Sequence, residues 1–283
     1  MEQVADPRAR VLIGVDALRE RLGTPDAPQL LDVRWRLGEP EGAGLERYRQ
    51  GHLPGARFLD LEAVLTGPLT DPRLGRHPLP SPERVANGLA GLGIDQDREV
   101  VVYDEPGSFA AGRAWWVLRW LGLDARVLDG GITAWQAAGA PVVAGDEDPV
   151  PPSLVGPLTA GYLANLTADQ VASFDGVLID VRAPERYRGE VEPLDPRAGH
   201  IPGAVNRPVG QFWEADGTLP APAKLRALLD VPDDRPVAVY CGSGVSAAQE
   251  LLALASLGID AALYPPSWSG WSADPDRPVA VGE

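Results

Sequence analysis

The chain has 283 residues, of which 45% are hydrophobic, and its formal net charge is −15 at pH 7. This length suits one large or two ordinary domains with ample core. The charge argues against nucleic acid as a partner, because phosphate backbones are bound by clustered Lys and Arg and the chain has no basic run.

The first residues lack the basic head, apolar stretch and small-residue cleavage site of a secretory signal. No apolar run approaches the roughly 18 residues that a membrane span requires. We therefore expect a cytoplasmic protein without a membrane partner. The lone cysteine, Cys241, has no second cysteine with which to form an internal disulfide.

The same motifs occur twice along the chain. "LLDVRW" at 30–35 recurs as "LIDVRA" at 178–183, and "GHLPGA" at 51–56 recurs as "GHIPGA" at 199–204. The segment that starts at Val100 resembles the one that starts at Val237, so that Asp104 stands where Cys241 stands. Copies of this length indicate a duplicated domain, because solenoid repeats have only about 20 to 50 residues.

Each half alternates short β-branched runs with helix-like segments. One helix is predicted between Ser81 and Gly93, because Ser81 can cap its start, Pro82 suits its first turn and Gly93 can end it. Further along the chain we expect strands at 100–103, 177–180 and 237–240, and helices at 110–121, 168–173 and 246–257. This order predicts an α/β protein in which each domain is a parallel sheet with helices on both faces.

The acidic, proline-rich stretch "GDEDPVPPSLVGP" at 145–157 is typical of an extended linker. We therefore divide the chain into a first domain at 1–146, a linker at 147–158 and a second domain at 159–283.

Cys241 lies between a predicted strand and a predicted helix, at the sheet edge where ligands bind in open parallel sheets. A free cysteine is more often a small buried residue than a reactive one. Here, however, a loop of small residues follows it, and converging amides with a helix N-terminus favour a thiolate or another anion. The loop consists of Gly242, Ser243, Gly244, Val245 and Ser246. Because the other copy has Asp104 instead, we interpret Cys241 as the nucleophile of one active copy.

The two GH motifs contain His52 and His200 as possible acid-base groups. A motif shared with the copy that lacks cysteine favours a loop-shaping role, which we expect for His200. The role of His52 stays open, because the first domain can face the site of the second. Arg182, Arg186, Arg188 and Arg197 follow the second DVR strand, and at least one of them is a candidate to hold a carboxylate or sulfonate.

The chain resembles the tandem rhodanese family, the thiosulfate and 3-mercaptopyruvate sulfurtransferases. The resemblance lies in the paired DVR strands, the paired GH(L/I)PGA motifs, the loop "CGSGVS" and the stretch "YPPSWSGW". The resemblance implies two rhodanese-like domains, of which the first is inactive and carries Asp104. It implies transfer of a sulfane sulfur from a small anionic donor, through a persulfide on Cys241, to thioredoxin, a small thiol or cyanide. It implies no metal or organic cofactor.

The resemblance also indicates the donor and the residues that handle it. Members that prefer thiosulfate tend to have basic residues directly after the cysteine, whereas Gly242 and Ser243 are uncharged. This favours 3-mercaptopyruvate, with thiosulfate as the alternative. In that subgroup the serine works with a histidine and an acid of the first domain, positions that His52 and Glu41 match by spacing.

The family's carboxylate-binding arginine falls on Arg186, in "ERYRGE". A second arginine before the histidine motif matches Arg197 only roughly, because the intervening segment is shorter here. The loop residues Gly242, Gly244, Val245 and Ser246 are expected to line the donor site.

Two other functions are alternatives for a chain with these motifs. Cdc25-like phosphatases share the fold, but their longer cysteine loop ends in an arginine that grips phosphate, and this chain has Ala247 and Ala248 there. A non-catalytic protein built from two rhodanese modules is the other alternative, and the retained Cys241 in its loop argues against it.

Overall fold

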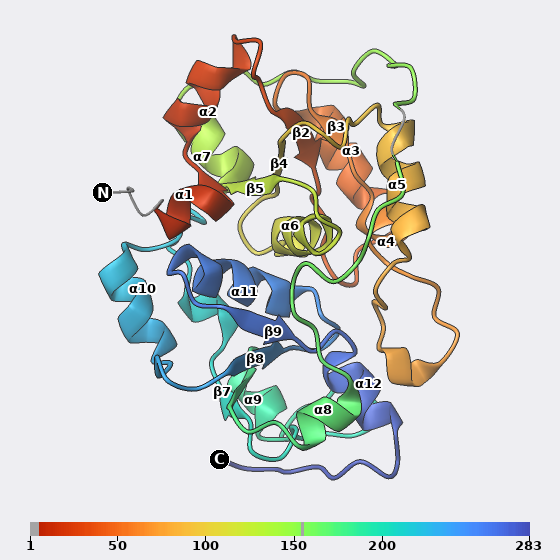
Figure 1. Cartoon of the computed structure of the whole chain (residues 1–283), viewed down its shortest axis with the longest axis vertical. Helices are drawn as coiled ribbons and strands as arrows, with labels where there is room; N and C mark the ends of the chain where they lie inside the picture. Colours follow the sequence, from red (N-terminus) through yellow and green to blue (C-terminus); the bar gives the residue numbers. More distant parts are fainter. Residues whose placement is uncertain (1–5, 154–155) are drawn as a thin grey trace.

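The structure is a computed structural model that describes residues 6–153 and 156–283. Both halves of the chain are α/β domains, which lie side by side with helices α6 and α11 between their sheets (Figure 1). The expected fold class is therefore confirmed.

The first domain contains a five-stranded parallel sheet in the order β1-β5-β4-β2-β3. Its strands are β1 (Leu12–Ile13), β2 (Gln29–Asp32), β3 (Arg57–Phe58), β4 (Val100–Tyr103) and β5 (Ala125–Leu128). Its helices are α1 (Pro7–Val11), α2 (Val15–Leu22), α3 (Ala43–Gln50), α4 (Leu61–Val64), the 3₁₀ helix η1 (Pro72–Leu74), α5 (Pro82–Gly91), α6 (Ala110–Trp120) and α7 (Gly131–Ala137).

The second domain contains a four-stranded parallel sheet in the order β7-β6-β8-β9. Its strands are β6 (Val177–Asp180), β7 (Val205–Asn206), β8 (Val237–Tyr240) and β9 (Ala261–Leu263). Its helices are α8 (Ala168–Ala172), α9 (Pro184–Tyr187), the 3₁₀ helix η2 (Val209–Gln211), α10 (Pro222–Leu229), α11 (Ser246–Ser256) and α12 (Ser267–Ala273).

The elements expected from the sequence are present. The strands at 100–103, 177–180 and 237–240 have the predicted bounds, and the three expected helices each end one residue earlier than predicted. Ser81 caps α5 by accepting a hydrogen bond from the Arg84 amide, with Pro82 in the first turn. The two copies share one register, because Asp32 pairs with Tyr103 as Asp180 pairs with Tyr240.

Alternate residues of the central strands are buried on opposite faces of each sheet, as expected for parallel strands covered by helices. In β4, Val101 and Tyr103 pack in a cluster with Trp135 of α7. Val100 and Val102 belong to a larger cluster that also includes Val239 of β8. This larger cluster runs through α6 and α11 from one domain into the other, so the two sheets are joined by a continuous apolar core.

The linker runs along the first domain before it enters the second. No helix or strand occurs at 147–153 or 156–158, and residues 154–155 of the expected linker lie outside the described residues. The Glu147 carboxylate accepts a hydrogen bond from the Gly55 amide, and the Asp148 carbonyl accepts one from Arg57. The division at residues 146 and 158 stays a prediction.

An excursion of the first domain reaches the second domain. This excursion consists of residues 68–77, and a hydrogen bond from the Gly67 amide to the Pro78 carbonyl closes its base. At its far end, η1 packs on α12 of the second domain. Gly75 has φ +79°, and a Cβ there would lie 2.4 Å from the Pro266 carbonyl oxygen. This close approach therefore requires glycine. The next amide, that of Arg76, donates to the Ser269 hydroxyl at 3.0 Å.

Glu250 on α11 is fully buried, and neither of its carboxyl oxygens has a hydrogen-bond partner among the described residues. Burial raises its pKa well above the ordinary value of 4.5, opposed by the charge of Arg207. The native state therefore favours the protonated acid, while the unfolded chain ionises. The contribution of Glu250 to the free energy of unfolding is therefore fully present below pH 4.5. Above that pH it declines by about 1.4 kcal/mol per pH unit, up to the native pKa.

We expect Glu250→Gln to stabilise the protein more at pH 8 than at pH 5, because glutamine has no proton to bind on folding. Chemical unfolding at both pH values measures the difference. Glu20→Gln, on the exposed face of α2, is the matched control and should change little at either pH. An equal effect of Glu250→Gln at the two pH values would contradict this account.

Neither of the described stretches contains a helix that is both long and apolar enough to cross a membrane. Within the same residues, no three His, Cys, Asp or Glu side chains are grouped as metal ligands would be.

Candidate active site

Cys241 lies at the carboxyl end of β8, in a loop whose amides point at its sulfur. Its Sγ accepts hydrogen bonds from the Ser243 amide at 3.4 Å and the Gly244 amide at 3.0 Å. The side chain is only 2% exposed. Gly244 has φ +85°, and a Cβ there would lie 2.6 Å from the Pro265 carbonyl oxygen, so this turn also requires glycine.

The start of α12 holds the loop from the other side. The Trp268 and Ser269 amides donate to the carbonyls of Cys241 and Gly242, both at 2.9 Å. The Cys241 amide in turn donates to the Ser267 hydroxyl at 3.1 Å. With α11 beginning directly after the loop and without a side-chain cap, the sulfur lies in a preformed cradle for negative charge.

In the first domain, Asp104 occupies the corresponding position after β4. Its Oδ2 accepts a hydrogen bond from the Ala111 amide in the first turn of α6. Burial raises the pKa of Asp104 to about 7, against the opposing effect of that amide and of Ser108. A carboxyl group thus fills the place that the thiol occupies in the second domain.

A pocket of about 390 Å³ opens above Cys241 and is lined by both domains. The first domain contributes Trp35, Arg76 and Phe109, and the second contributes Arg186 and loop residues that include Gly242, Ser243, Val245 and Ser246. A small organic anion fits a volume of this size.

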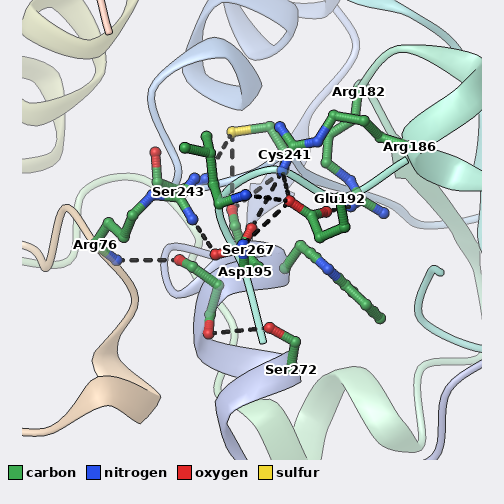
Figure 2. Close-up of polar contacts among 12 residues, drawn as sticks. Arg76, Arg182, Arg186, Glu192, Asp195, Cys241, Ser243, Ser267 and Ser272 are labelled. Atoms are coloured by element: carbon green, nitrogen blue, oxygen red, sulfur yellow. Dashed lines mark hydrogen bonds and ion pairs between the residues drawn. The ribbon is translucent and has the colours of Figure 1, made fainter. Parts of the chain in front are cut away.

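Figure 2 shows Arg76 and Arg186 from different domains converging beside the cysteine loop. Arg186 pairs with Glu192 at 2.6 Å and with Asp195 at 3.2 Å, and Arg76 pairs with the other oxygen of Asp195. The two carboxylates are buried, whereas the arginine side chains are 25% and 18% exposed. The acids therefore position the guanidiniums and leave part of each open to the pocket.

Gly242 leaves room for a ligand between these arginines. A Cβ at this position would lie 3.1 Å from an Arg76 nitrogen and 3.5 Å from an Arg186 nitrogen. Both guanidiniums are thus within reach of an anion bound next to the sulfur. Arg182 lies further back, where it pairs with the buried Asp180 at 2.7 Å and stacks on Trp268.

A serine–histidine–acid relay ends at the cysteine loop. Ser243 Oγ lies 2.7 Å from Nδ1 of His77, and Nε2 of His77 lies 3.1 Å from Glu62. The hydrogen bond with His77 holds the pKa of Glu62 below its usual value, against the effect of burial. Glu62 as a carboxylate accepts the Nε2 proton, which leaves Nδ1 to accept the hydroxyl proton of Ser243.

His52, which we expected as the partner of Ser243, lies elsewhere. It stacks on Tyr48, its Nδ1 contacts the Tyr48 carbonyl at 2.9 Å, and its backbone pairs with Val143. His200 stacks on Tyr187 in the same way, so the repeated GH motif shapes a loop in both copies.

Glu41 is exposed just before α3 and lines a different pocket of the first domain, where it contacts neither Ser243 nor His77. The acid beside the histidine is Glu62 of α4, which the spacing did not indicate. The expected pair of His52 and Glu41 is therefore replaced by His77 and Glu62.

Arg197 also lies outside the pocket. Its guanidinium donates to four backbone carbonyls at the end of α12 and just beyond it: those of Trp271, Ser272, Asp274 and Arg277. Helix C-termini leave such carbonyls without internal partners, which explains why a nearby arginine turns toward them. The second guanidinium next to Gly242, beside that of Arg186, belongs to Arg76.

The site combines a thiol in an amide cradle with two nearby arginines and a serine–histidine–acid chain, an arrangement suited to sulfur nucleophile chemistry on a small anion. The rhodanese-like domain model matches residues 14–138 and 159–274, and the chain belongs to the rhodanese family as a tandem-domain sulfurtransferase. The family and the names of its members support sulfurtransferase activity over the non-catalytic alternative.

Several relatives are similar over nearly the whole chain. A Mycobacterium tuberculosis protein, provisionally named thiosulfate sulfurtransferase SseB, is 45% identical over 97% of this chain and 98% of its own length. The Escherichia coli 3-mercaptopyruvate sulfurtransferase is 36% identical over 94% of this chain and 96% of its length. The crystal structure of E. coli SseA matches with a TM-score of 0.80 and 34% identity, over 91% of this chain and 98% of that one.

Proposed function

We propose that this sulfurtransferase takes sulfur from 3-mercaptopyruvate, holds it as a persulfide on Cys241 and passes it to a thiol or to cyanide. The observation that carries the proposal is the contact between Ser243 and His77 beside the cysteine loop. A donor whose sulfur bears a proton needs such a relay, because the proton has to move when the carbon–sulfur bond breaks.

In the first step the Cys241 thiolate attacks the thiol sulfur of 3-mercaptopyruvate. A sulfur–sulfur bond forms, the carbon–sulfur bond breaks, and its electron pair leaves with the carbon as the enolate of pyruvate. The proton of the donor thiol passes through Ser243 and His77 to that carbon. The products are pyruvate and the Cys241 persulfide anion, so no external oxidant or reductant is needed.

In the second step an acceptor removes the outer sulfur. Attack by a thiolate yields an acceptor persulfide, attack by cyanide yields thiocyanate, and the Cys241 thiolate is regenerated in both cases. The amides of Ser243 and Gly244 are placed to stabilise negative charge on sulfur. The acceptors that we propose are thioredoxin, a small thiol and cyanide.

The donor carboxylate is proposed to bind between Arg76 and Arg186. Both side chains face the pocket next to Gly242, and both are held by Asp195. Arginine pairs well with planar carboxylates because it offers parallel N–H donors.

We expect Arg186→Gln and Arg76→Gln each to raise KM for the donor by roughly 10- to 100-fold with a smaller change in kcat, since each removes a charge-assisted hydrogen bond. Steady-state kinetics with one acceptor measures both constants. Arg73→Gln is the matched control, because Arg73 lies on the same excursion but is 64% exposed and pairs with Asp71. An unchanged KM in both pocket variants would contradict this assignment.

Thiosulfate is the second candidate donor, favoured by the name of the M. tuberculosis relative and by the guanidiniums of Arg76 and Arg186 next to Gly242, which suit a dianion. Comparing kcat/KM for the two donors with one acceptor decides between them. We expect 3-mercaptopyruvate to be preferred by at least about tenfold, because the cysteine loop itself carries no basic side chain. A preference for thiosulfate would overturn the donor assignment.

A further inference from the structure

Arg113 of the first domain is a fully buried cation in contact with the cysteine loop of the second. Its guanidinium donates to four backbone carbonyls, those of Gly244 at 3.4 Å, Leu65 at 3.2 Å, His77 at 3.1 Å and Pro78 at 3.2 Å. Among the described residues it forms no ion pair with a carboxylate; Glu62, whose charge acts on it, is half exposed and bonded to His77.

These contacts connect Arg113 to both parts of the site. Gly244 accepts from Arg113 through its carbonyl and donates to the sulfur of Cys241 through its amide. His77 accepts from Arg113 through its carbonyl, while its ring contacts Ser243. One side chain therefore holds the backbone of the anion cradle and the backbone of the proton relay.

A buried guanidinium without a carboxylate is unfavourable unless other negative charge lies nearby. Burial lowers the pKa of Arg113 to about 10, which leaves it charged at neutral pH, and negative charge on Cys241 and Glu62 opposes the shift. Glu62 is half exposed, whereas Cys241 is buried. A sulfur anion on Cys241 is thus the buried counter-charge available to Arg113.

The other cations near the sulfur are already paired. Their partners are Asp180 and Glu192 for Arg182, Glu192 and Asp195 for Arg186, Asp195 for Arg76, and Glu105 for Arg36. The remaining titratable neighbour is His77, which is bonded to Ser243 and Glu62. Arg113 is therefore the described arginine at this site whose charge is left for the sulfur.

At the matching positions of the two copies, the first domain has a buried arginine and the second has a buried glutamic acid. Glu250 follows Arg113 by 137 residues, the same offset that separates Cys241 from Asp104. Both side chains are fully buried, on helices α6 and α11, which pack against each other. The cation of the first copy reaches the loop that carries the thiol. The acid of the second copy lies on the helix that follows this loop, and its burial favours the neutral form.

We propose that Arg113 is a positioning residue of the sulfur-transfer reaction. It orients Gly244 toward the sulfur and supplies, from the inactive domain, the positive charge that stabilises the Cys241 thiolate and the persulfide anion. The stabilisation of the persulfide anion rests on the proposed function, whereas the stabilisation of the thiolate does not depend on it.

The test measures how fast iodoacetamide alkylates Cys241 as a function of pH, because only the thiolate reacts and Cys241 is the only cysteine in the chain. In Arg113→Gln we expect the midpoint of the rate profile to move to higher pH, with about tenfold slower alkylation at pH 6.5 and an unchanged plateau at high pH. Arg113→Lys keeps the charge and should retain the profile of the parent protein.

Arg197→Gln is the matched control, because Arg197 also donates only to backbone carbonyls but lies outside the pocket. Its midpoint should match that of the parent protein. A folded Arg113→Gln with the parent midpoint would overturn the proposal, and so would a lysine variant that shifts as far as glutamine.

If Arg113→Gln does not fold, Arg113→Lys provides the test. A role limited to the four carbonyl contacts predicts that the lysine variant loses both stability and thiol reactivity. The proposed role of the charge predicts that it keeps the alkylation profile of the parent protein. Alkylation requires no donor. A wrong donor assignment would therefore appear in the steady-state kinetics and leave this result untouched.

Discussion

Cys241→Ser should abolish sulfur transfer while leaving the fold intact. A serine hydroxyl stays protonated in the cradle that favours the thiolate, and it cannot form a persulfide. We expect turnover to fall to the background rate with either donor. Thermal unfolding should change little, because the substitution replaces one small buried atom and keeps the loop contacts of Ser267 and Trp268 to the backbone.

Intact mass gives a direct measurement. After incubation with donor, the parent protein should gain the mass of one sulfur atom, which a reductant then removes, and Cys241→Ser should gain nothing. Asp104→Asn is the matched control at the equivalent position of the first domain and should keep turnover close to that of the parent. Turnover in Cys241→Ser near the parent rate would rule out the persulfide mechanism.

His77→Gln should separate the two donors. With 3-mercaptopyruvate we expect kcat/KM to fall by about 10² to 10⁴, the usual contribution of a general acid–base group. With thiosulfate the loss should be much smaller, because sulfite leaves with its electron pair and no proton needs to move. The contact between His77 Nδ1 and Ser243 Oγ at 2.7 Å is the basis of this difference.

Thiosulfate turnover of the same variant serves as the internal control for folding and for the reactivity of Cys241. Glu62→Gln should show a weaker form of the same selectivity, because the Glu62 side chain is half exposed and water can replace part of its contact. Equal losses with both donors would mean that His77 supports the loop rather than moves a proton.

Where motifs repeat, the sequence predicted the structure well. The paired DVR strands and the alternation of strands and helices predicted two parallel sheets, and the order β7-β6-β8-β9 recurs as β3-β2-β4-β5 in the first domain. The place of Cys241 between β8 and α11 followed from the glycine-rich turn after a buried strand. Local pattern suffices there, because a strand, a tight turn and a helix are determined by neighbouring residues.

Among the residues missed by the sequence, Arg76 and His77 come from the excursion at 68–77, and Glu62 comes from α4, whose counterpart η2 has Gly210 at the matching position. Of the three histidines, His52 and His200 share a motif and His77 stands alone. That asymmetry was the available signal for a specific role. Arg76 gave no such signal, because one arginine among many in a chain does not reveal where its side chain points.

The sequence alone determined the duplication, the α/β class and the loop that presents the only thiol, because these depend on periodicity and on residues close together in the chain. Only the tertiary structure decided which histidine, acid and arginines meet that thiol. His77, Arg76 and Arg113 reach the loop of Cys241 from more than a hundred residues away, through the packing of η1 on α12 and of α6 on α11. Contacts of that kind depend on how whole domains dock, and sequence spacing carries no information about docking.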